Sequence, residues 1–150
     1  MNLDPLISNH VLLSLLAAWV VAQALKLPLE YLRTHRWNWS LLVRAGGMPS
    51  SHSALVTATA QAVGLHAGFD SPIFGLAVAI AMIVVYDATG IRRQAGMQAQ
   101  KINILVDELL SGHPVSDKQL REVLGHTPLE ALGGVLLGVV VAQLFWFIWR

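Results

Sequence analysis

The chain has 150 residues, of which 55% are hydrophobic and 13% charged, and its formal net charge at pH 7 is +1. Soluble domains usually carry about 25% charged residues, so this composition predicts an integral membrane protein. The absence of cysteine excludes disulfides, thiolate catalysis and cysteine-ligated zinc, and the small net charge argues against a nucleic-acid partner.

Apolar stretches long enough to cross or enter a bilayer recur along the chain. There are four: Val11 to Leu25, which we expect to continue through Leu32, Ser53 to Phe69, Pro72 to Tyr86, and Ala131 to Trp149. A lone span needs about 20 residues, and only the last stretch approaches that length. We therefore expect an all-α, polytopic membrane bundle. It has about four membrane helices, short amphipathic helices between the third and fourth, and a single domain over residues 1–150.

The second stretch is too polar to face lipid. It contains Thr57, Thr59, Gln61 and His66, so we expect it to be shielded inside the bundle. Small residues recur every four positions there and in the last stretch, at Ala54, Ala58 and Ala62 and at Gly134, Gly138 and Ala142. Such stripes let helices approach closely in a membrane, and tight packing alone explains both.

Helix-start signals occur at several points. Ser71-Pro72 reads as an N-cap followed by a first-turn proline, and capping boxes begin at Ser116 and Thr127. The polar section from 87 to 130 begins with an amphipathic stretch that we expect to lie along the bundle or along the membrane interface. Its apolar residues at helical spacing are Ile102, Leu105, Val106 and Leu109.

The basic residues are distributed unevenly between the two membrane faces. Only Arg150 falls on the side of the termini, whereas nine fall on or near the other side: Lys26, Arg33, Arg36, Arg44, Arg92, Arg93, Lys101, Lys118 and Arg121. The positive-inside rule makes that second side cytoplasmic. We expect the bacterial cell membrane as the location.

The polar motifs fall on this same face. They are Lys26 and Arg33, Ser50-Ser51-His52, Asp87 with Arg92 and Arg93, and His126 with Glu130. A helix beginning at Ser50 or Ser51 after two glycines offers free N–H groups and a positive dipole end, which favour an anion such as phosphate.

Each motif also has a simpler explanation. Ser50 could be only an N-cap, Lys26 and Arg33 could snorkel to the interface, and His126 could be a surface histidine. Glu130 is explained as the capping-box carboxylate, and Asp87 could pair with Arg92 or Arg93. A metal site formed by Asp87 with Asp107 or Glu108 is a weak alternative, because no ligand spacing repeats. The simpler explanations account poorly for the coincidence of all the motifs on one face.

These residues resemble those of the type 2 phosphatidic acid phosphatase superfamily, which includes the vanadium-dependent haloperoxidases, and specifically its divergent branch. The superfamily pattern is Lys, six residues, Arg-Pro, then Pro-Ser-Gly-His, then Ser-Arg, five residues, His, three residues, Asp. Lys26 is followed by six residues and Arg33, Pro49-Ser50-Ser51-His52 matches the second part, and His126 with Glu130 resembles the third. The phrases GGMPSSHSAL, YDATGIRRQAG and LGHTPLEALGG are typical of the divergent branch.

The chain departs from the superfamily pattern in each part. Thr34, Ser51 and Glu130 replace the usual proline, glycine and aspartate, and Arg121 precedes His126 by four intervening residues rather than five. Arg92 or Arg93 could therefore supply the third-motif arginine, with Asp87 and Arg121 as possible supporting residues. Two of the six helices typical of the superfamily are also missing, which makes a homodimer plausible.

The resemblance implies hydrolysis of a phosphate monoester or diphosphate of a membrane lipid, without a metal or another cofactor. His126 would attack phosphorus, Glu130 would orient His126, and His52 would protonate the leaving oxygen. The phosphate-binding residues would be Lys26, Arg33, Ser50, Ser51 and one of Arg92 and Arg93. Two alternatives remain: an inactive protein that binds or moves a lipid phosphate through the same pocket, and a structural subunit.

Overall fold

The structure is a computed structural model that describes residues 4–42, 46–110 and 125–149. All regular secondary structure in these segments is helical, which confirms the predicted all-α fold. The elements in chain order are α1 (Asp4–Ile7), α2 (His10–Thr34), the 3-10 helix η1 (Trp39–Leu42), α3 (Ser51–Ala67), α4 (Pro72–Thr89), α5 (Ile91–Leu110) and α6 (Pro128–Ile148).

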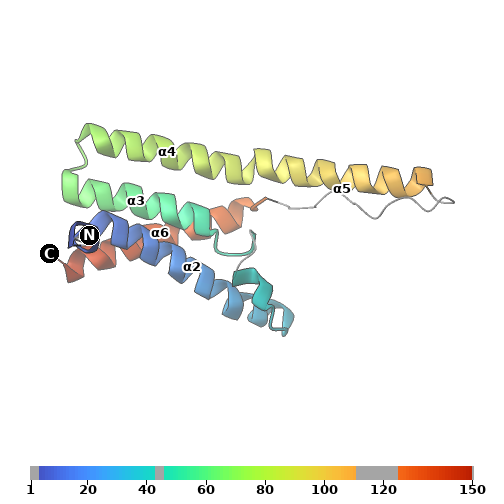
Figure 1. The fold of residues 1–150 in the computed structure, drawn as a ribbon, viewed down its shortest axis with the longest axis horizontal. Coiled ribbons are helices and arrows are strands. Elements are labelled where there is room, and N and C mark those ends of the chain that lie inside the picture. Colours follow the sequence, from blue (N-terminus) through green and yellow to red (C-terminus); the bar gives the residue numbers. More distant parts are fainter. Residues whose placement is uncertain (1–3, 43–45, 111–124, 150) are drawn as a thin grey trace.

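Helix α3 lies at the centre of the bundle. It packs against α4 on one side and against α2 and α6 on the other (Figure 1). The core between these helices consists mainly of small residues such as Ala18, Ala58 and Ala142, whereas large apolar side chains such as Ile83 and Leu136 are exposed. Small residues inside and large apolar residues outside are typical of helices packed within lipid.

The membrane helices follow the predicted stretches closely. Helix α2, the joined helices α4 and α5 from Pro72 to Asp107, and α6 are each long and apolar enough to cross a membrane. The predicted continuation of the first stretch through Leu32 is confirmed, since α2 ends at Thr34. Helix α3 has only 17 residues, and one of its polar side chains is hydrogen-bonded within the bundle, where Gln61 Nε2 donates to Gln143 Oε1 at 3.2 Å.

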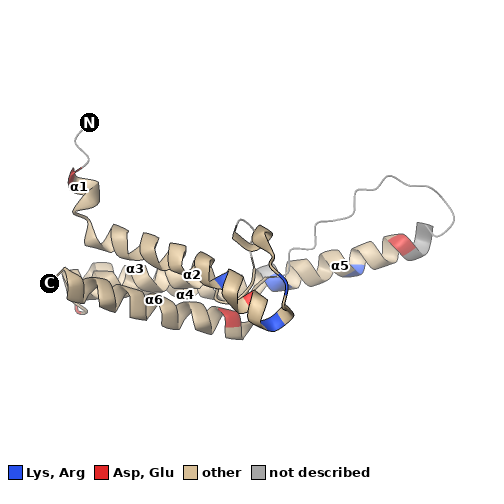
Figure 2. Cartoon of the chain, turned by 90° about the horizontal axis from the view of Figure 1, so that it is seen from below, with Lys and Arg blue, Asp and Glu red and all other residues tan. Residues whose placement is uncertain are grey.

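The predicted capping signals explain where the helices begin. Ser71 caps α4, with its side chain accepting from Phe74 N–H, and Thr127 and Glu130 form the reciprocal capping box of α6. Both termini and the α3–α4 turn lie at one end of the bundle (Figure 1), and most charged residues of the bundle helices lie at the other end (Figure 2). The predicted gathering of the polar motifs at one end is therefore present.

The section after α4 differs from its prediction. The first predicted amphipathic stretch is helical and forms part of α5, a 20-residue helix, but α5 contacts only α4 among the described elements, so it does not lie along the bundle. Its placement along the membrane interface stays a prediction. Figure 1 shows it continuing the line of α4 away from the bundle. The reason is local. Only Gly90, with non-helical φ −101° and ψ −84°, separates the two helices, and no proline or turn sequence redirects the chain. The capping box at Ser116 lies outside the described residues.

Candidate functional site

The beginning of α3 is the first component of the site. Gly46 and Gly47 adopt positive φ angles of 103° and 82° just before it, and Ser50 caps the helix through its side-chain oxygen, which accepts from Ser53 N–H at 3.3 Å. Ser50 and Ser51 are both buried. A helix start with buried serines and a glycine approach presents N–H groups and a positive dipole end to any anion bound there.

Lys26 is the cation nearest to this helix start. Its side chain is 1% exposed, and its only hydrogen bond within the described residues is a long one, with Nζ donating to Ser51 Oγ at 3.5 Å. A Cβ at Gly47 would lie 3.8 Å from Lys26 Cδ, so the glycine backbone covers the lysine methylenes. A buried ammonium is costly unless it is paired, and this one forms no ion pair with a described carboxylate. The arrangement therefore favours an anion beside Ser51.

His126 is held at both its backbone and its ring. Its N–H donates to the carbonyl oxygen of Ala88 at 3.0 Å, and its Nδ1 lies 3.2 Å from Glu130 Oε2. An ionised carboxylate can only accept a hydrogen bond, so this contact favours the tautomer with the proton on Nδ1 and the lone pair on Nε2. The ring is buried, and its unprotonated nitrogen is the one suited to nucleophilic attack.

Glu130 performs two tasks with one oxygen. Its Oε2 accepts from His126 Nδ1 and also from Thr127 N–H at 3.0 Å, while Thr127 Oγ1 accepts from Glu130 N–H at 3.3 Å. The two interpretations of Glu130 from the sequence, a capping residue and a histidine partner, therefore hold together. The capping box fixes the carboxylate in the position from which it reaches the ring.

The two motif histidines come together within one chain. The ring centroids of His52 and His126 are 6.2 Å apart, with the ring planes inclined at 59°. His52 is exposed, and Ser50 N–H donates to Glu130 C=O at 2.9 Å, which ties the start of α3 to the start of α6. A single chain therefore brings the two rings together, and a second copy is not needed for that.

The remaining predicted residues lie at the edge of this cluster or beyond it. Arg33 is exposed, seven residues and thus about 10 Å further along α2 than Lys26. Arg93 is also exposed, in the first turn of α5, and Asp87 lies in the last turn of α4, next to the Ala88 carbonyl that holds His126. The side chain of Arg92 and the whole of Arg121 lie outside the described part of the chain.

The weak metal alternative finds no support in the described segments. No three His, Cys, Asp or Glu side chains there come close enough together to hold an ion. Asp87 and Asp107 are 20 residues apart along the nearly straight α4 and α5 helices, which separates them by about 30 Å.

The sequence analysis did not identify two residues that shape the site, Ala88 and Gly134. The Ala88 carbonyl positions His126 through a backbone bond that leaves no signal in the residue type. Gly134 allows α6 to approach the backbone of Ser50, and its stripe with Gly138 was visible but was interpreted only as packing.

The comparisons with known proteins agree with this architecture. A model described as the divergent PAP2 family matches residues 7–141. The chain belongs to the divergent PAP2 family. It is also similar to the "Uncharacterized membrane protein YuiD" of Bacillus subtilis (strain 168), with 42% identity over 155 residues that cover 93% of this chain and 98% of that protein. No solved structure matches.

Membership of the divergent PAP2 family confirms the resemblance drawn from the three motifs. The matched range includes every described member of the cluster, from Lys26 in α2 to Glu130 in α6. With the three apolar helices and a relative that is named a membrane protein, it identifies the chain as an integral membrane protein.

Proposed function

We propose that this divergent PAP2 protein is a phosphatase that hydrolyses a phosphate monoester or diphosphate of a membrane lipid through a phosphohistidine intermediate. One observation carries the proposal. At the start of α3, within a single chain, the buried Lys26 ammonium lies 3.5 Å from the Ser51 hydroxyl, and the ring of the next residue, His52, lies 6.2 Å from that of His126. A phosphate group there would meet a cation, helix N–H groups, a nucleophile and an acid.

The first step forms a bond between His126 Nε2 and phosphorus and breaks the bond between phosphorus and the lipid oxygen. Glu130 holds the proton on Nδ1 and stabilises the positive charge that the ring acquires. His52, protonated, gives its proton to the leaving oxygen, so the lipid departs as a neutral alcohol or, from a diphosphate, as a monophosphate.

The second step reverses these roles. His52, now neutral, removes a proton from water, the water oxygen attacks phosphorus, and the bond to His126 breaks to release inorganic phosphate. Lys26 and the N–H groups at the start of α3 bind the equatorial oxygens, where charge develops, and one such donor is typically worth about 10²–10³ in rate. Arg33, Arg93 and Arg92 are proposed to attract the phosphate from the edge of the cluster.

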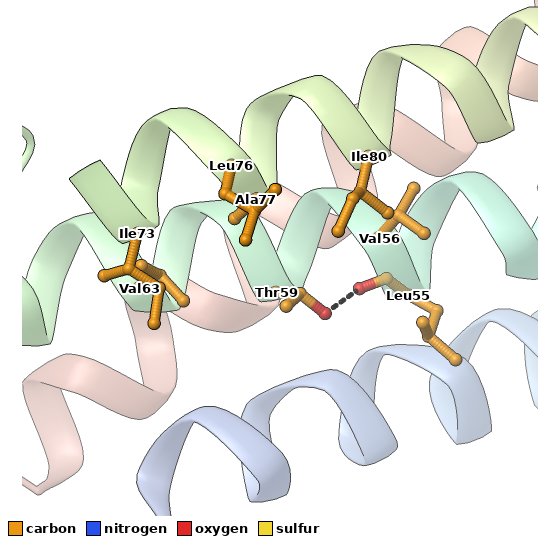
Figure 3. A pocket seen from close by; sticks show the side chains of 8 residues that line it. All are labelled: Leu55, Val56, Thr59, Val63, Ile73, Leu76, Ala77 and Ile80. Carbon is orange, nitrogen blue, oxygen red and sulfur yellow. Dashed lines mark hydrogen bonds between the residues drawn. The ribbon is translucent and has the colours of Figure 1, made fainter. Parts of the chain in front are cut away.

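An apolar groove supports an amphiphilic substrate. It occupies about 380 Å³ between α3 and α4, and Figure 3 shows its lining side chains. Leu55 and Val56, at one end, follow His52 by three and four residues on α3, so they continue the helical face that carries the histidine. A lipid with its phosphate at His52 could lay its hydrocarbon chain along this groove.

The test is phosphate release by the purified full-length protein in detergent or in vesicles. Lipid phosphates of several classes would be offered to the wild type and to the His126→Ala and His52→Ala variants. We expect release by the wild type and its loss in both variants. Binding of vanadate or of a lipid phosphate without any release would instead favour the inactive binding protein, and neither binding nor release would favour a structural subunit.

We further propose that this site faces the cytoplasm of a bacterial cell. The basic residues favour that side, although sites of the superfamily commonly face away from the cytoplasm. A cysteine at the exposed Ser40 position, in a chain without other cysteines, reports the orientation. Protection from an impermeant maleimide in intact cells is expected, and labelling from outside would overturn the orientation.

A further inference from the structure

The start of α3 and the start of α6 touch more closely than side chains would allow. A Cβ added at Gly134 would collide with the carbonyl oxygen of Ser50, and it would lie 2.9 Å from Ser53 Cβ and 3.2 Å from Ala54 N. Two of these three neighbours are backbone atoms of a buried, capped helix start, so they cannot rotate away as a flexible side chain could.

The backbone of Ser50 also contacts α6 one turn earlier in that helix. Ser50 N–H donates to the carbonyl oxygen of Glu130 at 2.9 Å, and Glu130 lies four residues before Gly134 on the same face of α6. The backbone of Ser50 is therefore held on both sides, by a hydrogen bond through its N–H and by the bare Cα of Gly134 against its C=O.

This contact joins the starts of α3 and α6, which carry the two sets of proposed catalytic residues. His126 is tied to α6 through Glu130, whereas His52 and Ser51, the hydrogen-bond partner of Lys26, belong to α3. The distance between the nucleophile and the anion cradle thus depends on how closely α6 approaches Ser50.

We infer that Gly134 is a positioning residue that sets the distance from His126 to a phosphate held at the start of α3. The inference rests on the proposed function, because it assigns a catalytic consequence to that distance. A methyl group at position 134 would push α6 away from α3 while leaving each half of the site intact. A phosphate would still bind to the cradle, but His126 would be out of reach.

The chain supplies two matched controls for a Gly134→Ala variant. Gly133→Ala makes the same change in the same helix, but its Cβ would meet mainly the flexible end of Met48, at 3.3 Å from Cε. Gly138→Ala meets backbone as closely, at 2.5 Å from Ala54 O, but one turn further from the site. It therefore reports the cost of packing alone.

The experiment measures kcat, KM and thermal unfolding for the three variants in the full-length protein. In Gly134→Ala we expect kcat to fall by about tenfold to a hundredfold with little change in KM, since misplacement by about 1 Å can cost that much. Gly133→Ala should resemble the wild type, and Gly138→Ala should lose stability with a smaller fall in kcat. Equal falls in kcat for Gly134→Ala and Gly138→Ala, at equal losses of stability, would overturn the inference.

A second readout does not depend on catalysis. The chain has no cysteine, so nitroxide labels on Met48→Cys and Leu129→Cys, both at exposed positions, report the spacing between the starts of α3 and α6. Adding Gly134→Ala should lengthen the distance between the labels, whereas adding Gly133→Ala should not. If the wild type releases no phosphate, the proposed function fails, while this distance still decides whether Gly134 sets the spacing. An unchanged distance would overturn the positioning role.

Discussion

The two ends of the bundle each bring together two histidines from different segments, yet only one end also carries the other residues on which the proposed phosphate chemistry rests. At the motif end, His52 and His126 are 6.2 Å apart, and at the opposite end His10 and His66 are 5.3 Å apart. The surroundings of the two pairs differ. At the motif end α3 and α6 begin, Lys26 is buried and Glu130 holds a ring nitrogen. At the opposite end α3 finishes and α2 begins, and His10 stacks on Trp149 instead.

This comparison shows that proximity of imidazoles does not by itself predict a catalytic site. Helices begin at both ends, since α2 begins at His10 itself, but among the described residues only the motif end places a buried ammonium, that of Lys26, beside a helix start. The ring of His126 is oriented by a carboxylate, while aromatic contacts position the ring of His10. The predictions below test whether these surroundings make the difference.

The largest effect is expected when the histidine pair at the motif end is replaced by glutamine, and the same replacement at the opposite end serves as the control. His52→Gln with His126→Gln should abolish the phosphoenzyme and lower turnover by about 10⁴-fold or more, because the nucleophile and the group that transfers protons are both removed. His10→Gln with His66→Gln should leave both unchanged. Trapping of acid-labile, phosphate-labelled protein measures the intermediate. An equal loss in both pairs would show that the histidines act through the fold rather than through chemistry.

A smaller effect is expected from removing the buried cation. Lys26→Met keeps most of the side-chain volume and should lower kcat/KM by about 10²–10³, the usual loss for one donor to a developing charge. The thermal stability of the Lys26→Met variant should stay the same or rise, because the cost of burying an ammonium disappears. Arg33→Met, at an exposed position, should lower kcat/KM by no more than about tenfold. A stability loss with unchanged activity would make Lys26 a structural residue.

The smallest effect is expected from filling the groove. Ala77→Phe places a ring between α3 and α4 and should raise KM by several-fold for long-chain lipid phosphates but not for short-chain ones. Ala79→Phe makes the same change on an exposed face of α4 and serves as the control. If both variants alter KM equally, or if chain length makes no difference, the hydrocarbon chain does not occupy this groove.

Much of the fold was predictable because membrane helices are encoded by composition and their starts by capping residues. The capping box at Thr127 and the N-cap at Ser71 marked the beginnings of α6 and α4, where local hydrogen bonds decide the boundary. The course of α5 was not predictable, since a single glycine does not indicate whether two helices bend apart or stay in line.

The site was predictable in its residue types but not in its geometry. The alternation of the predicted spans placed His52, His126 and Lys26 at one face, but it did not fix the distances between them. The sequence could not show which cation is buried. Lys26 is buried and Arg33 is exposed, and this difference depends on how far α2 extends past the bundle. Nor could the sequence show that the Ala88 carbonyl holds His126, since backbone acceptors carry no residue signature.

The shared oxygen of Glu130 links the chemistry to the assembly of the protein. Because the same carboxylate atom closes the first turn of α6 and aligns the imidazole, a chain in which α6 has not yet formed a helix cannot hold that ring in its orientation. Under the proposed function, hydrolytic competence would then arise only after α6 has inserted, so chains without an inserted α6 would leave the lipids around them untouched.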